Sequence, residues 1–193
     1  DKTMEKRIWK KEWFKNVVFL AILGVLFFTP VGKWIRVQIQ SVFLFSPSNE
    51  IEEESADKNV LDFPFQLMDA DGNDFLLSEM EGKPIFINFY ASWCGPCLAE
   101  FRSMQAMQAA LPHIQFLFIT REAEREYYKF IESTKYDYPF YMQKSRNPPE
   151  FEHESIPASF MLNAQGKLVY KHIGAANWSD EDIIEELDAL SRS

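Results

Sequence analysis

Cysteine is nearly absent from this chain of 193 residues: it occurs only at Cys94 and Cys97, within one motif. A framework of structural disulfides is therefore excluded, and any thiol chemistry is confined to one place. A structural zinc site needs four ligands, and no ligand-like spacing relates the cysteines to the three histidines, which are His113, His153 and His172. We therefore expect no metal and no cofactor.

Basic residues are few in the body of the chain. Residues 47–193 carry twelve Lys/Arg against 26 Asp/Glu, whereas residues 1–46 carry eight Lys/Arg against three acids. An acidic body repels phosphate, so we expect it to bind no nucleic acid. The hydrophobic fraction of 47% is too high for a disordered chain. The basic N-terminal segment is better explained by a membrane.

The longest apolar run, residues 17–28, falls short of the ~20 residues that usually span a bilayer. However, no residue from 16 to 32 is charged, and Trp13 and Trp34 bracket the run at a helical spacing of about 31 Å, close to the hydrocarbon thickness. We expect a transmembrane anchor at 16–32 that contacts the lipid bilayer. A cleaved signal peptide is the alternative, but no small-residue cleavage site follows the run.

The orientation of this anchor follows from its flanks. Six Lys/Arg precede the uncharged segment, and Lys33 and Arg36 follow it. By the positive-inside rule, residues 1–15 form a basic cytoplasmic N-terminus, and everything after the anchor lies outside. Residues 33–59 are predicted to be a juxtamembrane segment and an acidic linker, which its own charge extends.

Residues 60–193 have the pattern of one α/β domain. Strands are predicted at 63–68, 75–77, 83–90, 114–119, 159–162 and 167–170, and helices at 96–110, 122–136 and 179–190. The first two strands flank a glycine-containing turn and predict a hairpin. In the second helix we expect Tyr128 and Ile131 to face inward, and Ser179 is expected to cap the last helix. Strands alternating with helices indicate a sheet whose faces are covered by helices.

The motif Trp93-Cys94-Gly95-Pro96-Cys97 lies where a buried strand is predicted to end and a helix to begin. Free N–H groups and the dipole at a helix N-terminus stabilise a thiolate, the nucleophile of thiol–disulfide exchange. Pro96 suits the first helical turn, where its missing N–H costs nothing. We expect Cys94 to be the exposed attacking thiol and Cys97 the more buried resolving thiol. A permanently closed disulfide is the alternative, although so short a loop gives little stabilisation.

The segment Phe89-Tyr-Ala-Ser-Trp-Cys-Gly-Pro-Cys97 resembles the active site of thioredoxins, and Asn88 and Glu100 around it are similar to the membrane-anchored TlpA/ResA branch. The resemblance covers about residues 58–190. It implies a thioredoxin fold, which is a central mixed sheet flanked by helices, here with an N-terminal β-hairpin extension. It also implies a thiol–disulfide oxidoreductase that reduces protein disulfides, for example in cytochrome c maturation or envelope redox homeostasis.

The same resemblance implies a substrate site. Ile156-Pro157 lies just before a predicted strand, where thioredoxin-fold proteins carry a cis-proline packed against the active-site disulfide. A cis bond turns the chain sharply and leaves the backbone groups of the preceding residue free for a peptide. We expect Trp93, Ile156 and Pro157 to contact the substrate.

Two polar residues flank the motif. Glu100 lies three residues after Cys97, so both share a helical face. Desolvated beside the thiols, Glu100 could exchange a proton with Cys97; on the helix surface it would be an ordinary solvated glutamate. In a cleft or on the surface, it is expected to contribute little to stability. Asn88 is expected to be a buried polar residue whose hydrogen bonds go to the backbone.

Together these observations predict an extracytoplasmic thiol–disulfide oxidoreductase that crosses the bacterial cell (inner) membrane once, with its C-terminal domain on the periplasmic side. Its partners would be protein thiol or disulfide substrates and a membrane electron donor, because that compartment lacks the cytosolic reducing system. One alternative is a peroxide reductase of thioredoxin fold, whose Pro-x-x-x-Thr/Ser-x-x-Cys pattern is absent before Cys94. The other is a redox-inert, membrane-tethered docking protein, against which the intact motif argues.

Overall fold

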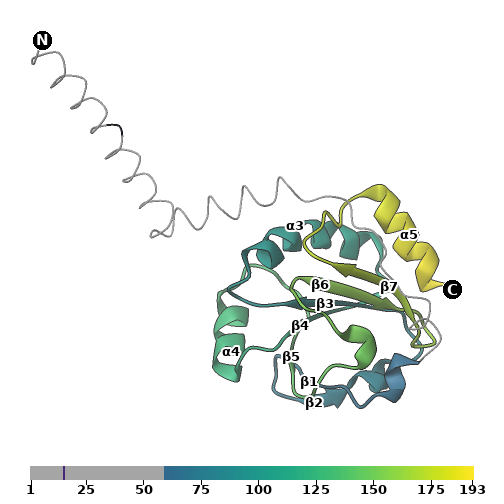
Figure 1. Ribbon diagram of the computed structural model, residues 1–193, viewed down its shortest axis with the longest axis horizontal. Helices are drawn as coiled ribbons and strands as arrows, with labels where there is room; N and C mark the ends of the chain where they lie inside the picture. Colours follow the sequence, from purple (N-terminus) through teal and green to yellow (C-terminus); the bar gives the residue numbers. More distant parts are fainter. Residues whose placement is uncertain (1–14, 16–58) are drawn as a thin grey trace, which may run out of the picture. The chain divides into compact units, whose positions relative to one another are not determined.

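The computed structural model describes Lys15 and residues 59–193 (Figure 1). Within these residues, no helix combines the length and the apolar character that crossing a bilayer requires. The anchor expected at 16–32 lies outside them, as does almost all of the segments expected at 1–15 and 33–59.

A seven-stranded mixed sheet forms the centre of the described fold, in the order β2-β1-β5-β4-β3-β6-β7 (Figure 1). The strands are β1 Gln66–Met68, β2 Asp74–Leu76, β3 Ile85–Tyr90, β4 Gln115–Thr120, β5 Phe140–Gln143, β6 Ala158–Leu162 and β7 Leu168–Ile173. Strands β3, β4 and β5 are parallel, and the remaining pairs are antiparallel. The predicted N-terminal hairpin is present as β1 and β2. Every residue of β3 is buried, as its near-continuous apolar run predicted.

Three helices, α3 Gly95–Ala110, α4 Glu124–Ser133 and α5 Glu181–Ser191, pack against this sheet in the described part of the chain. Alternate residues of β3 face opposite sides, so two hydrophobic clusters form. Phe86 and Tyr90 belong to the cluster that contains the buried residues of α3, α4 and α5. Ile87 and Phe89 belong to the other, which the short 3-10 turns at Val60–Asp62 and Pro149–Phe151 help to cover. The expectation of helices on both faces is therefore not met by the described residues.

Helix α4 is shorter than expected, and the tyrosine that faces the core is one position earlier in the sequence than predicted. The expected helix 122–136 is reduced to Glu124–Ser133, and the fully buried side chain is Tyr127 instead of Tyr128. The Tyr127 hydroxyl donates to the carbonyl oxygen of Phe140 at 2.8 Å, which orients the helix against β5. Tyr128 and Ile131 are half-buried.

Helix α5 begins at Glu181, which is one residue too late for Ser179 to be its N-cap. The carboxylate of Asp180 accepts from the N–H of Asp182 at 3.1 Å, so Asp180 is the N-cap. The Ser179 hydroxyl instead donates to Asn177 Oδ1 at 2.7 Å. The expected cap at Ser179 is therefore wrong by one residue, and Asp is as good an N-cap as Ser.

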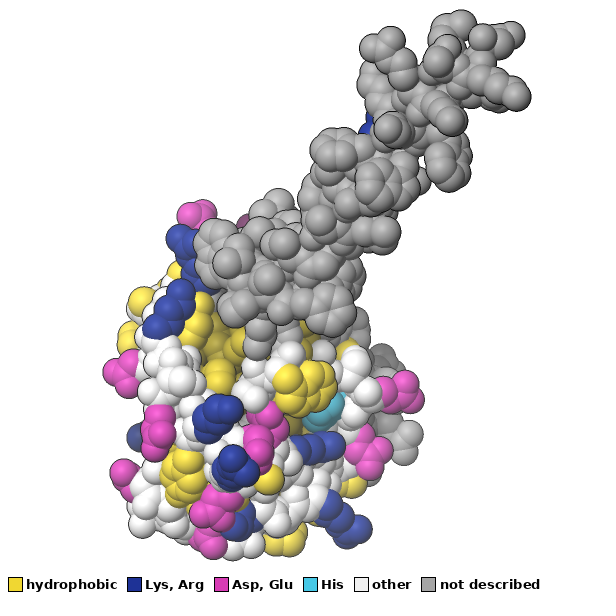
Figure 2. All heavy atoms as spheres, turned by 90° about the vertical axis from the view of Figure 1, so that its left-hand side faces the viewer, with side chains coloured by type: hydrophobic (Ala, Val, Ile, Leu, Met, Phe, Trp, Pro, Cys, Tyr) yellow, Lys and Arg dark blue, Asp and Glu magenta, His cyan; other side chains and the backbone are white. Residues whose placement is uncertain are grey.

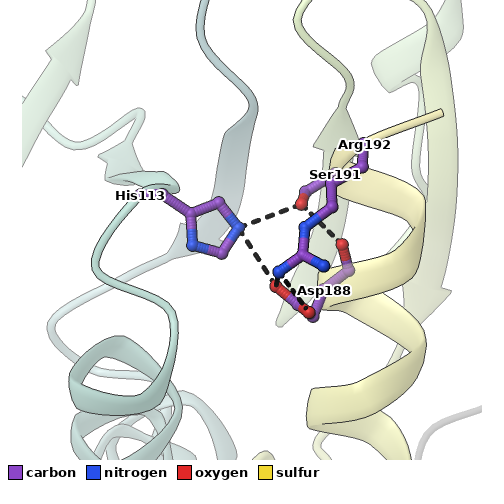
Figure 3. Close-up of polar contacts among 4 residues, drawn as sticks. All are labelled: His113, Asp188, Ser191 and Arg192. Carbon is purple, nitrogen blue, oxygen red and sulfur yellow. Dashed lines mark hydrogen bonds and ion pairs between the residues drawn. The ribbon is translucent and has the colours of Figure 1, made fainter.

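The end of α5 is held against the loop that follows α3 (Figure 3). His113 Nε2 lies 3.0 Å from Ser191 Oγ and 3.3 Å from Asp188 Oδ1. A terminal nitrogen of Arg192 lies 2.7 Å from Oδ2 of the same Asp188 carboxylate. His113 therefore has a structural contact that joins the loop after α3 to the end of α5.

The turn between β6 and β7 generates a prediction about stability. Gly166 lies there at φ 76°, and its carbonyl oxygen accepts from Val60 N–H at 2.9 Å. A Cβ at this position would lie 2.7 Å from Leu61 Cδ1 and would also press on the side chain of Asn59. We predict that Gly166→Ala lowers the free energy of unfolding by about 2–4 kcal/mol, because backbone strain and overpacking add. Chemical denaturation measures the loss.

Gly82 provides the matched control. It has a similar φ of 89°, but a Cβ there would meet nothing within 4 Å. Gly82→Ala should therefore cost only the backbone strain, about 1–2 kcal/mol. Equal losses in the two variants would contradict the close packing of residues 59–61 on the β6–β7 turn.

Candidate active site

The candidate site lies at the edge of the sheet where β3 ends and β6 begins. These strands are antiparallel, with Phe89 opposite Ala158. The loop that leaves β3 and the loop that enters β6 are therefore neighbours. The first carries Trp93 and Cys94, and the second carries Ile156 and Pro157.

Cys94 and Cys97 form a disulfide at the start of α3, with Cα atoms 5.3 Å apart. Cys94 is the N-cap of the helix, and its Sγ accepts from the backbone N–H of Cys97 at 3.2 Å. Pro96 lies in the first turn, as expected. Cys94 is only 4% exposed and Cys97 is fully buried, so the predicted order of accessibility holds, but Cys94 is not an exposed residue.

The cis-proline expected before β6 is confirmed, since the Ile156–Pro157 bond is cis. The carbonyl oxygen of Ile156 lies 4.0 Å from Cys94 Sγ. Trp93 is 71% exposed and stands beside the disulfide. The structure thus brings the expected substrate-contacting residues together around the Cys94 sulfur.

A groove with a volume of about 690 Å³ opens beside Cys94. We call it the active-site groove; the lining residues used below are Phe89, Trp93, Cys94, Arg121, His153 and Ile156. Its lining is largely apolar near the sulfur, and its charged residues come from the end of β4 and from the loop before β6. A groove of this size can receive a segment of a polypeptide.

Glu100 is fully buried, as the desolvated alternative predicted, and the alternative of a surface glutamate is wrong. Its Oε1 accepts from Asn88 Nδ2 at 2.9 Å, and its Oε2 accepts from Trp178 Nε1 at 3.0 Å and from Ala176 N–H at 3.2 Å. Burial raises the pKa of Glu100 from 4.5 to about 8, although these three hydrogen bonds act in the opposite direction. Glu100 is therefore largely protonated at neutral pH.

Asn88 also differs from its expected environment. Its amide nitrogen donates to two side chains, Glu100 and Ser159, instead of to the backbone. Its buried Oδ1 has no hydrogen-bond partner among the described residues. In the described part of the chain, no hydrogen bond joins Glu100 to either sulfur. Any effect of Glu100 on the thiols is therefore electrostatic, or it passes through another group that bridges the carboxyl and a sulfur.

Two further residues of the site were not identified from the sequence. Glu122, just after β4, accepts from Ser92 N–H and from the Ser92 hydroxyl, both at 2.7 Å, and so holds the loop that carries Cys94. Trp178 contributes the indole N–H to Glu100. Glu122 could have been suspected because it follows the end of a strand parallel to β3. No local signal pointed to Trp178, which is distant in sequence.

Comparisons with known proteins agree with this geometry. The Redoxin family profile matches residues 55–187. The thiol-disulfide oxidoreductase ResA of Bacillus subtilis is 27% identical over 130 residues, which cover 65% of this chain and 70% of the relative. ResA of Bacillus cereus is 23% identical over 165 residues, covering 83% and 87%.

Solved structures give the same result. A thiol:disulfide interchange protein of the thioredoxin family from Chlorobium tepidum has a TM-score of 0.54 at 26% identity, covering 66% of this chain and 94% of that one. The fold is thus thioredoxin-like, and the Cys94–Cys97 disulfide stands at the helix start that thiol–disulfide exchange requires. The chain belongs to the Redoxin family and is a thiol–disulfide oxidoreductase with a Cys-x-x-Cys pair.

Proposed function

We propose that this oxidoreductase reduces protein disulfides outside the cytoplasm while anchored to the membrane, with Cys94 as the attacking thiol and Cys97 as the resolving thiol. The observation that carries the proposal is the position of Cys94 Sγ at the start of α3. There it accepts the Cys97 N–H and borders the active-site groove. After reduction, the same N–H and the helix dipole stabilise a thiolate on Cys94.

The reaction consists of two exchanges. The Cys94 thiolate attacks one sulfur of the substrate disulfide, forms a mixed disulfide and expels the second substrate sulfur as a thiolate. Cys97, as a thiolate, then attacks Cys94 Sγ, so that the Cys94–Cys97 bond forms and the mixed disulfide breaks. The substrate takes up protons and two electrons, and the protein is left oxidised. A membrane dithiol donor restores it by the reverse exchanges.

Trp93, Ile156 and Pro157 are proposed to position the substrate. The Ile156 carbonyl lies beside the reactive sulfur, where an extended peptide can add main-chain hydrogen bonds to the loop before β6. The exposed Trp93 ring offers apolar and aromatic contact area on the other side of Cys94.

Glu100 is proposed to hold a proton for the cysteine pair. It lies one helical turn after Cys97, and its raised pKa places its titration near neutral pH. A group that is protonated at pH 7 and shielded from water can deliver a proton to a thiolate and recover it afterwards. The hydrogen bonds from Asn88 and Trp178 fix the carboxyl in place for this role.

The proposed topology rests on the N-terminal sequence. The uncharged segment 16–32 and the six preceding cations support an anchor whose following residues, 33–193, lie outside the cytoplasm. In this arrangement residues 33–59 link the membrane to the catalytic domain, 60–193. The named ResA relatives are thiol–disulfide oxidoreductases, which supports the chemistry assigned to that domain.

The assignment of the two cysteines predicts a trapped intermediate. Cys97→Ser should retain attack by Cys94 but lose the release step, so a mixed disulfide with a reducible protein such as insulin should accumulate. Non-reducing electrophoresis detects it. Cys94→Ser is the matched control and should trap no substrate. Trapping by Cys94→Ser alone would reverse the two roles, and wild-type protein that fails to reduce insulin with a dithiol donor would contradict the proposed function.

The environment of Glu100 predicts a pH-dependent difference in stability. Because its pKa is raised on folding, the native state holds the proton more tightly than the unfolded state. The contribution of Glu100 to the free energy of unfolding is therefore complete below about pH 4.5 and is lost as the pH rises towards about 8. Glu100→Gln removes this dependence. Between these pH values, the free energy of unfolding of the variant should therefore rise relative to that of the wild type by up to about 1.4 kcal/mol per pH unit. Denaturation of the oxidised chain across this pH range measures it.

The same variant tests the proton-holding role. Glu100→Gln should change the thiol titration of the reduced pair and the pH profile of insulin reduction, which a purely structural role would leave unmoved. Glu185→Gln, at an exposed site on α5, is the matched control and should change neither. Unaltered titration and pH profile in Glu100→Gln would exclude the role.

The topology predicts which part of the chain a protease can reach. Added to intact spheroplasts, a protease should remove the residues beyond about 47, because the domain is expected on the outer side of the membrane. A cytoplasmic marker protein should survive in the same sample. Protection of the domain until the membrane is lysed would place the chemistry in the cytoplasm.

A further inference from the structure

Arg121 occupies a defined place at the end of the active-site groove. It follows β4 directly, and β4 is parallel to β5, with Thr120 opposite Met142. Arg121 and Gln143 are therefore neighbours at the same edge of the sheet at which Cys94 follows β3. This edge, beyond the carboxyl ends of the parallel strands, is where α/β sheets usually bind ligands.

The guanidinium group of Arg121 is held on one side. Its Nε donates to Gln143 Oε1 at 3.0 Å, and its central carbon lies 5.9 Å from the centre of the Phe89 ring. The amide of Gln143 is itself oriented, since its Nε2 donates to the carbonyl oxygen of Ser145. The terminal nitrogens of Arg121 have no hydrogen bond or ion pair among the described residues. Arg121 is an exposed residue, and the bond at Nε restrains the orientation of the fork that these nitrogens form.

Arg121 also joins two hollows. One is the active-site groove, and the other, of about 650 Å³, is lined by polar residues that include Gln143, Arg146 and Asn147. Arg121, His153 and Glu154 line both. A polypeptide whose sulfur reaches Cys94 and whose chain continues into the second hollow must therefore pass the guanidinium group.

The other charged groups of the active-site groove do not compete for this role. Both carboxylate oxygens of Glu122 accept hydrogen bonds from Ser92, and one also accepts from the Thr120 hydroxyl. His153 lies with Nδ1 2.7 Å from the Phe151 carbonyl oxygen, and burial lowers its pKa, so it is neutral at pH 7. Among the described residues that line this groove, Arg121 is thus the one cation.

Glu154, which lines both hollows, is the remaining acid of the groove, and Glu152 lines the second hollow only. Both are exposed, and neither forms an ion pair with Arg121 in the described structure. Figure 2 shows basic, acidic and hydrophobic side chains interspersed on one face of the molecule. Because residues 47–193 carry a large excess of acid, an acidic partner is repelled overall and gains attraction only where an unpaired cation is presented.

We propose that Arg121 is a specificity-determining residue that binds a carboxylate of the protein substrate, carried close in sequence to the cysteine that Cys94 attacks. This inference rests on the proposed function. A planar guanidinium held at Nε offers its two terminal nitrogens to both oxygens of a carboxylate, which fixes the orientation of the bound segment as well as its position. The carboxylate can belong to an acidic side chain or to a C-terminus.

The test uses synthetic disulfide peptides and the full chain with a dithiol donor. Glutamate is placed at successive positions on either side of the peptide cysteine, and each peptide has a glutamine twin. All carry an amidated C-terminus, except one arm that keeps a free C-terminal carboxylate. We expect the best-placed glutamate, or the free C-terminus, to raise kcat/KM by roughly three- to tenfold over its neutral twin, through KM and not kcat.

Three variants locate the effect. Arg121→Met keeps the apolar contact with Phe89 but removes the fork, and it should abolish the preference for carboxylate, read as the ratio of kcat/KM between each glutamate peptide and its glutamine twin. Arg125→Met, at an exposed site on α4 outside both hollows, is the matched control and should retain the preference. Glu154→Gln should keep or increase it, because a neighbouring acid is removed.

Each other outcome overturns a different statement. Equal rates for charged and neutral peptides, in the wild type and in Arg121→Met, would overturn the specificity and leave the proposed function intact. Rates that fall equally for all peptides in Arg121→Met and in Glu154→Gln would show that the two residues pair with each other and do not read the substrate. Failure of the wild type to reduce any peptide or insulin would instead contradict the proposed function itself.

Discussion

The carboxyl group of Glu100 connects the parts of the fold on which the site depends. A carboxyl without access to water must obtain its hydrogen bonds from the protein, and each buried group left unpaired costs about 1–3 kcal/mol. Asn88 supplies one bond from β3, and Ala176 and Trp178 supply two from the segment between β7 and α5. Because Glu100 belongs to α3, the helix that carries Cys94 cannot shift on the sheet without breaking them.

The direction of the strands explains why one edge collects the chemistry. Parallel β3 and β4 end at the same edge, and antiparallel β6 begins there. The thiol at Cys94, the carbonyl at Ile156 and the guanidinium at Arg121 therefore come from three loops, far apart in sequence, that the sheet brings to one groove. Glu122 adds a direct tie between the loops after β3 and β4 through Ser92. The sheet fixes where the loops lie, and the loops carry the sulfur, the carbonyl and the guanidinium group.

The features predicted correctly from the sequence are those that depend on local pattern. The apolar run predicted β3, and the proline in the motif predicted the start of α3 to within one residue. The bond between Ile156 and Pro157 is cis, as expected. The features that were missed depend on partners distant in the chain. Glu100 accepts a hydrogen bond from Trp178, 78 residues away, and no spacing rule relates the two. The near-complete burial of Cys94 likewise depends on the loop before β6.

That burial has a consequence for how the disulfide meets its surroundings. With 4% of Cys94 accessible and Cys97 enclosed, attack on the bond requires an approach along the groove. Small thiols must use the same path, so they exchange with this disulfide more slowly than with an exposed one of equal reduction potential. Proteins that dock beside the groove, such as the proposed substrates, would bring a sulfur to Cys94 along this path. Access through one groove thus separates the rate of exchange from the reduction potential, so that two thiols of equal reducing power can react at different rates.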